Sequence, residues 1–402
     1  MDLGQDLGHL TYSTLVHPGD TWKEMWNSLT TYVPKVKARV CPDAPFGVSL
    51  RLSAASAKTL TNDARERERL KAFLDDHDLY LYTVNAFPYG PFKGRVVKED
   101  VYEPDWRTDA RAVYTMEVAN ILAEVTNEGI DPTIQSPPLA FKPRIYRPSH
   151  VEELTHQVLR VVAHLIQLHK TSGRKVRLAL EPEPYCFLET TEEAISYFKE
   201  HLYSKLAVDQ IVAQTDLSRS GAEAALHDHL GMVYDICHQA VEFEDVGASL
   251  QALADEGIPV FKLQEAAAIR TPEVTQEKVD ALQKFAESVY LTQTVEKRNG
   301  ELTRYLNLED AFAAWDKDPG PREWRTHFHV PVFLDDLGDF KTTRFAIEDA
   351  LRFHKKNKLS PQLEIETYTW DVLPDHLKTG DIVDYVVMEL EWVREQLLGK
   401  QA

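Results

Sequence analysis

Residues 176–184 read VRLALEPEP, a short apolar run that ends in a carboxylate, Glu181. Seven other short runs share its apolar or β-branched character and are followed by a helical pattern: Leu7–Val16, Phe46–Leu52, Leu79–Ala86, Gly231–Ile236, Ile258–Leu263, Thr326–Phe333 and Leu363–Thr369. Strands that alternate with helices are typical of parallel βα units, and eight such strands close into a barrel. The sequence therefore predicts an α/β fold, a (β/α)8 TIM barrel.

The connections between these strands differ in length. Thr21 and Glu24 form a capping-box pattern, which predicts a helix directly after the first strand. Residues 95–148, after strand three, and 189–229, after strand four, are longer than a minimal barrel needs. Residues 289–306, between strands six and seven, predict a β-hairpin turned at Asn299–Gly300. Because no Gly/Ser linker separates them, we interpret all three as insertions in one domain, residues 1–402.

Composition excludes several classes of protein. The chain has 402 residues and a formal net charge of −19, so its surface repels nucleic acid. No apolar run approaches the roughly 20 residues that cross a bilayer, and the first residues lack the features of a signal peptide. Three scattered cysteines form no disulfide framework. These features predict a cytoplasmic protein without a membrane span or a nucleic-acid partner.

Side chains at the carboxyl ends of barrel strands share one mouth, which is where such enzymes carry out their chemistry. Polar residues stand at or near these ends in most of the predicted strands: His9, Asn85, Glu181, Asp235, His238, Lys262, Gln264, His327, His329, Glu364 and Glu366. Period-two alternation places the paired members of a strand on one face. His9 is also compatible with a hydrogen-bonded core histidine, and Phe87 with either a substrate wall or loop packing.

Several carboxylates buried together require a cation among them. Each residue alone is more often a salt-bridged or structural group, but their joint position at strand ends favours a metal site. Glu, Asp and His ligands suit Mn²⁺, Mg²⁺, Co²⁺ or Zn²⁺. The expected ligands are three carboxylates, one of two histidines and a neutral amide: Glu181, Asp235, Glu366, His327 or His329, and Gln264.

Six blocks along the chain resemble a known superfamily: GHLTYSTLVHPGDTW, TVNAFPYGPFKG, LALEPEPYC, YDICH, EWRTHFHVPVF and LEIETYTWDVLP. They resemble the xylose-isomerase-like barrels, and within these the EboE family, which is named for metabolite traffic. The resemblance implies that Glu181, Asp235 and Glu366 bind one divalent metal and that His238 contacts the substrate. The chain departs from the pattern where Gln264 replaces the usual strand-six histidine. The EboE resemblance also implies a bacterial operon of small-molecule biosynthesis or export.

Three functions fit these features. The first is a metal-dependent isomerase or epimerase of a sugar, sugar phosphate or cyclitol, in which Glu181 and Glu366 move the proton. Its expected substrate-binding residues are His238, Asn85, Lys262, Glu364, His9 and Phe87. The second is a Schiff-base lyase that uses Lys262, although pairing of this lysine with a carboxylate is the simpler interpretation. The third is a non-catalytic metabolite-binding or scaffold protein that acts with other proteins of its pathway.

Overall fold

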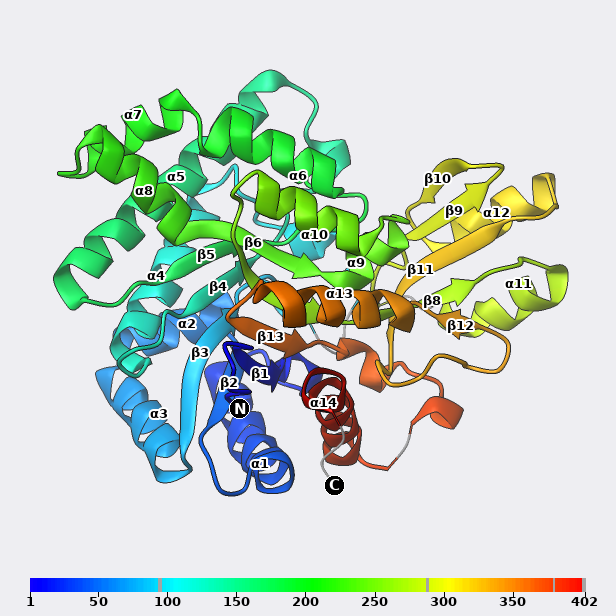
Figure 1. The fold of residues 1–402 in the computed structure, drawn as a ribbon, viewed down its shortest axis with the longest axis horizontal. Helices are drawn as coiled ribbons and strands as arrows, with labels where there is room; N and C mark the ends of the chain where they lie inside the picture. Colours follow the sequence, from blue (N-terminus) through cyan, green and yellow to red (C-terminus); the bar gives the residue numbers. More distant parts are fainter. Residues whose placement is uncertain (93–95, 287–288, 379, 400–402) are drawn as a thin grey trace.

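The computed structural model describes residues 1–92, 96–286, 289–378 and 380–399, and within them eight parallel strands form a barrel (Figure 1). Their spatial order is β1-β13-β7-β6-β5-β4-β3-β2. A parallel bridge between Ser13 and Ser49 joins the first and last strands of this order, so the sheet closes. The strands are β1 (His9–Tyr12), β2 (Phe46–Arg51), β3 (Leu79–Asn85), β4 (Thr133–Ser136), β5 (Arg177–Leu180), β6 (Leu230–Asp235), β7 (Val260–Glu265) and β13 (Gln362–Ile365). The predicted (β/α)8 barrel is confirmed.

Two strand assignments need correction. The predicted seventh strand, residues 326–333, lies outside the barrel in β11 (Glu323–Val330). The true fourth strand is β4, within residues 95–148 that we interpreted as an insertion. Its sequence, TIQS, is short and has three polar residues out of four, so it lacks the apolar run by which the other strands are found. The strands that end near Glu181, Asp235 and Glu366 are therefore the fifth, sixth and eighth strands of the barrel.

A second sheet stands beside the barrel, on the right in Figure 1. It is largely antiparallel, and its strands in spatial order are β10 (Glu301–Tyr305), β9 (Thr294–Arg298), β11, β8 (Ala267–Thr271) and β12 (Lys341–Thr342). The predicted hairpin is confirmed as β9 and β10. Asn299 and Gly300 both have positive φ, 53° and 88°, as a tight hairpin turn requires. This sheet follows β7 directly, so it packs over the barrel mouth.

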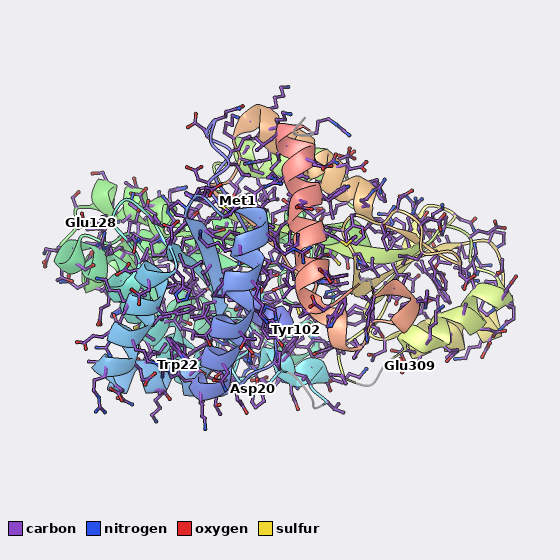
Figure 2. All side chains as sticks on the ribbon, turned by 90° about the horizontal axis from the view of Figure 1, so that it is seen from below. Met1, Asp20, Trp22, Tyr102, Glu128 and Glu309 are labelled. Atoms are coloured by element: carbon purple, nitrogen blue, oxygen red, sulfur yellow. The ribbon has the colours of Figure 1, made fainter. Side chains whose placement is uncertain are left out.

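Helices cover the outside of the barrel and flank the second sheet: α1 (Trp22–Val40), α2 (Ala54–Asn62), α3 (Ala64–Asp76), α4 (Asp109–Val125), α5 (Pro148–Ser172), α6 (Thr191–Tyr197), α7 (Lys205–Gln214), α8 (Arg219–His229), α9 (Ile236–Val241), α10 (Val246–Asp255), α11 (Gln276–Leu282), α12 (Leu308–Lys317), α13 (Arg344–Asn357) and α14 (Ile382–Leu398). The predicted capping box of Thr21 and Glu24 starts α1. Helices α1 and α14 lie side by side, as Figure 2 shows from below. No helix in the described ranges has the length and apolar character to cross a membrane.

Polar side chains fill the barrel interior beneath the mouth. The Thr133 hydroxyl lies 2.8 Å from that of Thr83 and donates to Gln362 Oε1 at 2.5 Å. One layer higher, Lys262 and Glu364 form an ion pair of 2.7 Å, and both are fully buried. A hydrogen-bonded interior of this kind holds the strands in register and gives the mouth a rigid floor.

Candidate metal centre and active site

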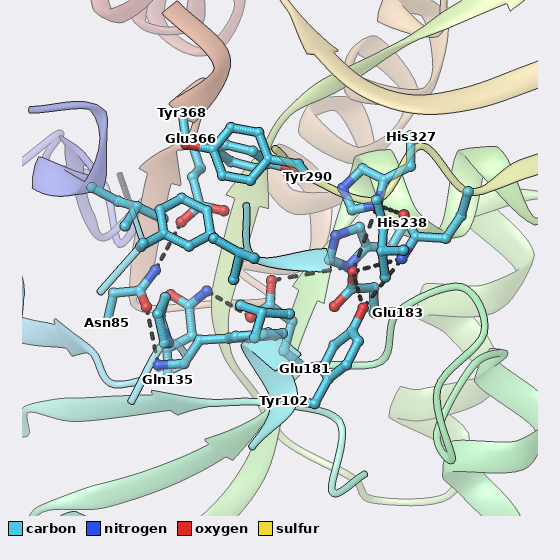
Figure 3. Close-up of a pocket in the computed structure, with 18 of the residues that line it drawn as sticks. Asn85, Tyr102, Gln135, Glu181, Glu183, His238, Tyr290, His327, Glu366 and Tyr368 are labelled. Carbon is cyan, nitrogen blue, oxygen red and sulfur yellow. Dashed lines mark hydrogen bonds and ion pairs between the residues drawn. The ribbon is translucent and has the colours of Figure 1, made fainter. Parts of the chain in front are cut away.

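A pocket opens at the carboxyl ends of the barrel strands, with about 530 Å³ of empty space when the open solvent at its entrance is included (Figure 3). Its floor is polar and comes from separate strands: Asn85 ends β3, Gln135 lies in β4, Glu181 follows β5 and Glu366 follows β13. Four further polar residues line one side: Glu183, His238, Gln293 and His327. This arrangement is consistent with the prediction that polar side chains at the ends of the strands meet in one mouth.

Three carboxylates meet beside this floor. One oxygen from each of Glu181, Asp235 and Glu366 lies within 4.8 Å of the others, and none of the residues is more than 5% exposed. Burial, and then the charge of Glu366, raises the pKa of Glu181 well above its ordinary value. Burial, followed by the charge of Glu364, does the same for the pKa of Glu366. A cation among the three carboxylates would offset the cost of burying them together.

Gln264 places its side-chain nitrogen between the three carboxylates. Nε2 donates to Asp235 Oδ2 at 2.6 Å, to Glu366 Oε2 at 2.7 Å and to Glu181 Oε1 at 2.9 Å. An amide NH₂ has two hydrogens, so three acceptors exceed its capacity. Its Oε1 is buried and makes no hydrogen bond. A half-turn of the amide would add this oxygen to the carboxylate set, which then fits a hard or borderline divalent cation.

Three histidines lie next to the carboxylates and turn their Nε2 atoms inward. His238 donates from Nδ1 to the carbonyl of Pro182 at 2.8 Å, and His329 donates from Nδ1 to the carbonyl of Glu366 at 2.5 Å. His327 Nδ1 lies 3.0 Å from Gln293 Oε1. Gln293 Nε2 donates to Glu183 Oε1, which leaves its Oε1 to accept from His327. A ring that donates from Nδ1 in this way turns Nε2 toward the site, which is the arrangement of a histidine that binds a metal.

The Nε2 atoms of His327 and His329 are only 3.3 Å apart. Burial lowers the pKa of His329 to about 4 and the pKa of His327 well below its ordinary value, so both rings are neutral at pH 7. Two lone pairs that face one another repel unless a cation lies between them. Three sets of potential ligand atoms, each within 4.8 Å, include these rings: Cys237 with His327 and His329, Asp235 with His238 and His329, and Glu183 with His238 and His327.

Other predicted site residues lie elsewhere. Lys262 and Glu364 form their ion pair below the floor and do not line the pocket, because their strand positions lie one layer deeper. His9 begins β1 at the opposite end of the barrel, where its Nδ1 lies 2.7 Å from the Tyr80 hydroxyl. His9 is therefore hydrogen-bonded as expected, but it is only half-buried and does not belong to the core. Asn85 and Phe87 do line the pocket, and Asn85 donates to Glu366 Oε1 at 2.8 Å.

Several polar pocket residues were absent from the sequence prediction; they are Lys98, Tyr102, Gln135, Glu183, Tyr290, Gln293 and Tyr368. Glu183 stands two residues after Glu181, and this spacing was a usable signal. Gln135 lies in the strand that the prediction lacked. It links two parts of the site, because its Oε1 accepts from Lys262 at 2.5 Å while its Nε2 donates to Glu181 Oε2 at 2.6 Å. Tyr102 ends a short 3-10 helix, Lys98–Tyr102, and Gln293 directly precedes β9, so neither stands at the end of a barrel strand.

Scans of protein-family models and of curated proteins find no match to this chain. Solved structures similar to it include the IOLI protein with a bound zinc atom, at 12% identity over 97% of this chain and 98% of that one, TM-score 0.48. A xylose isomerase domain protein from Planctomyces limnophilus is 12% identical over 97% of each chain, TM-score 0.49. A xylose isomerase-like TIM barrel protein from Mycobacterium smegmatis in complex with magnesium is 10% identical over 94% and 89%, TM-score 0.47.

At sequence identities of 10–12%, conclusions about the chemistry of this chain rest on the geometry of its own residues. The EboE resemblance, the bacterial operon, the cytoplasmic location and the single domain stay predictions.

Proposed function

We propose that this protein is a divalent-metal-dependent isomerase or epimerase that acts on a sugar, sugar phosphate or cyclitol. The observation that carries the proposal is the convergence of Glu181, Asp235 and Glu366, three buried carboxylates from separate strands, within 4.8 Å. A bound Mn²⁺, Mg²⁺, Co²⁺ or Zn²⁺ would polarise a substrate carbonyl and its neighbouring hydroxyl, and so make the adjacent C–H more acidic. His329 and the amide oxygen of Gln264 would complete the ligand set.

Glu181 and Glu366 are the proposed proton carriers. Each is held by an amide donor, Gln135 for Glu181 and Asn85 for Glu366. A carboxylate held in this way can accept a proton at one carbon of the substrate and return it at another. His238 lies beside them, with Nδ1 fixed by a backbone carbonyl and Nε2 turned toward the site. It is placed to hold a substrate hydroxyl or the metal.

Proton exchange with solvent tests this proposal. The metal-loaded protein is incubated in D₂O with a panel of ketoses, ketose phosphates and inososes, and deuterium is followed by NMR. We expect deuterium at the carbon next to the carbonyl of at least one compound. Glu181→Gln and Glu366→Gln should each slow this exchange by at least about 100-fold. Glu128→Gln, at a side chain that is 92% exposed, is the matched control. Exchange that is equally fast in both site variants would refute the proposal.

A second candidate, a non-catalytic metabolite-binding protein, has one observation in its favour. The Gln264 amide donates to all three carboxylates, and a proton shared between Glu181 and Glu366 would then replace the cation. Glu181→Ala separates the two functions. An enzyme loses turnover and keeps ligand affinity, whereas a binding protein loses affinity and has no turnover to lose.

The Schiff-base alternative has less support, because Lys262 is fully buried and held by Glu364 and Gln135 below the floor. Borohydride in the presence of a ketone substrate should leave Lys262 unmodified.

A further inference from the structure

Two walls of the pocket are largely apolar, in contrast to its floor. Lys98 and the hydroxyl groups of Tyr102, Tyr290 and Tyr368 are the polar groups that also line it there. The two walls come from two small clusters of buried side chains, each separate from the main core. We call them the tyrosine cluster, which is Leu15, Phe92, Val97, Tyr290 and Tyr368, and the leucine cluster, which is Tyr102, Phe141, Cys186 and Leu291 with Phe87 packed against it. All members except Phe141 and Cys186 line the pocket.

In the tyrosine cluster, three aromatic rings form a compact wall. The ring centroid of Phe92 lies 4.8 Å from that of Tyr290 and 5.4 Å from that of Tyr368, and the two tyrosine rings are 5.2 Å apart. In the leucine cluster, Phe87 and Tyr102 are 5.9 Å apart. Val101 packs against both clusters and also lines the pocket. The pocket therefore lies between two apolar surfaces.

Polar groups gather on the floor and on one side of this space. Figure 3 shows Asn85, Gln135 and Glu181 low in the view and Glu183, His238 and His327 on the right, with Tyr290 and Tyr368 above. A polyol with a hydroxyl on every carbon would turn several of them toward rings and aliphatic side chains. Each hydroxyl buried without a partner weakens binding. A molecule with one polar and one apolar end would satisfy both parts.

We infer that the natural substrate is amphiphilic: its head is a hydroxy-ketone or vicinal diol, and it carries an aryl or alkyl group that lies between the tyrosine and leucine clusters. This inference rests on the proposed function, since the head is the part on which the carboxylates act. It narrows the substrate from sugars and cyclitols in general to derivatives that bear an apolar substituent.

A matched pair of ligands tests the inference. 1-Hydroxy-4-phenylbutan-2-one and 1-hydroxybutan-2-one share a hydroxy-ketone head and differ by one phenyl group. Calorimetric titration of the Mn²⁺-loaded protein should show at least about tenfold tighter binding of the phenyl compound. Equal affinity, or no measurable binding of either compound, would overturn the inference.

Substitutions in the leucine cluster test whether the phenyl group binds there. Leu291→Asn places an amide in the leucine cluster and should reduce the affinity ratio to about threefold or less, whereas Leu291→Met should retain it. Leu306→Asn is the matched control, because Leu306 packs against the same cluster but does not line the pocket. A ratio that is unchanged in Leu291→Asn would contradict the assigned position.

The test of the apolar substituent can fail without failure of the proposed isomerase or epimerase reaction, and the reverse also holds. The affinity ratio should persist after the metal is removed with a chelator, because the apolar walls contain no metal ligand. If the protein exchanges deuterium but binds both compounds equally, this inference is wrong and the proposed reaction stands. If it prefers the phenyl compound but exchanges no deuterium, the proposed reaction is wrong and the apolar subsite stands.

Discussion

At the scale of single residues, the contact between His327 and His329 is the feature that most favours a cation in this site. Both rings are buried and neutral, and both use Nδ1 as a donor, so two lone pairs face one another at 3.3 Å. A cation between the two rings would remove this repulsion, and burial, which lowers the pKa of both rings, disfavours protonation as the alternative.

His329→Ala should therefore weaken the affinity for Mn²⁺ or Zn²⁺ by at least about tenfold. Competition with a metal-sensitive dye measures this affinity. His354→Ala is the control, because His354 is buried and hydrogen-bonded to the carbonyl of Leu7, away from the pocket. An unchanged affinity in His329→Ala would remove the histidine from the ligand set.

Lys262 stabilises the barrel interior through its ion pair with Glu364 and its hydrogen bond to Gln135. Removal of its charge leaves Glu364 buried without its partner and Gln135 without a donor on Oε1. We expect Lys262→Met to lower the free energy of unfolding by about 3–5 kcal/mol, measured with urea, and Lys262→Met/Glu364→Leu to recover most of the loss. A loss under about 1 kcal/mol in the single variant would show that this ion pair contributes little.

Among the elements, β11 explains how two histidines reach one site. Its pairing with β8 is regular up to Thr326, opposite Ile269, and resumes at His329, opposite Ala268. The irregularity between them is a bulge, which redirects side chains locally. The alternation in THFHV correctly placed both histidines on one face. The sequence could not show that this face belongs to a second sheet, because alternation does not reveal which strands will be partners.

Helix α14 is held to the barrel through Glu389, a fully buried carboxyl group. It accepts hydrogen bonds from the Thr367 hydroxyl at 2.7 Å and from the backbone N–H of Val332 at 3.2 Å. Burial raises its pKa from 4.5 to about 8. The folded protein thus keeps a proton that the unfolded chain releases above pH 4.5. The stabilising effect is complete below pH 4.5 and is lost as the pH rises through 8.

Glu389→Gln should remove this contribution to the pH dependence. Between pH 5 and 8 the wild-type free energy of unfolding should fall by roughly 1.4 kcal/mol per pH unit relative to the variant. Urea denaturation of both proteins at pH 5, 6.5 and 8 measures the difference. Parallel stability curves for the two proteins would contradict the raised pKa of Glu389.

For the molecule as a whole, the repeat of strand and helix was enough to predict the barrel. It did not identify every strand, because β4 contributes only TIQS and is recognised by its pairing with β3 and β5. The three carboxylates followed from their position at strand ends. The exact neighbours of each carboxylate depend on long-range contacts, such as Gln135 with Glu181, which no local pattern encodes.

The central claim is that the barrel mouth binds a divalent cation through Glu181, Asp235 and Glu366. Elemental analysis of protein purified without a chelator tests it most directly. We expect at least about one equivalent of Mn, Mg, Co or Zn per chain, lost in Glu181→Gln/Glu366→Gln and retained in Glu128→Gln. Folded wild-type protein that contains none of these metals, and binds none when each is added, would contradict the account.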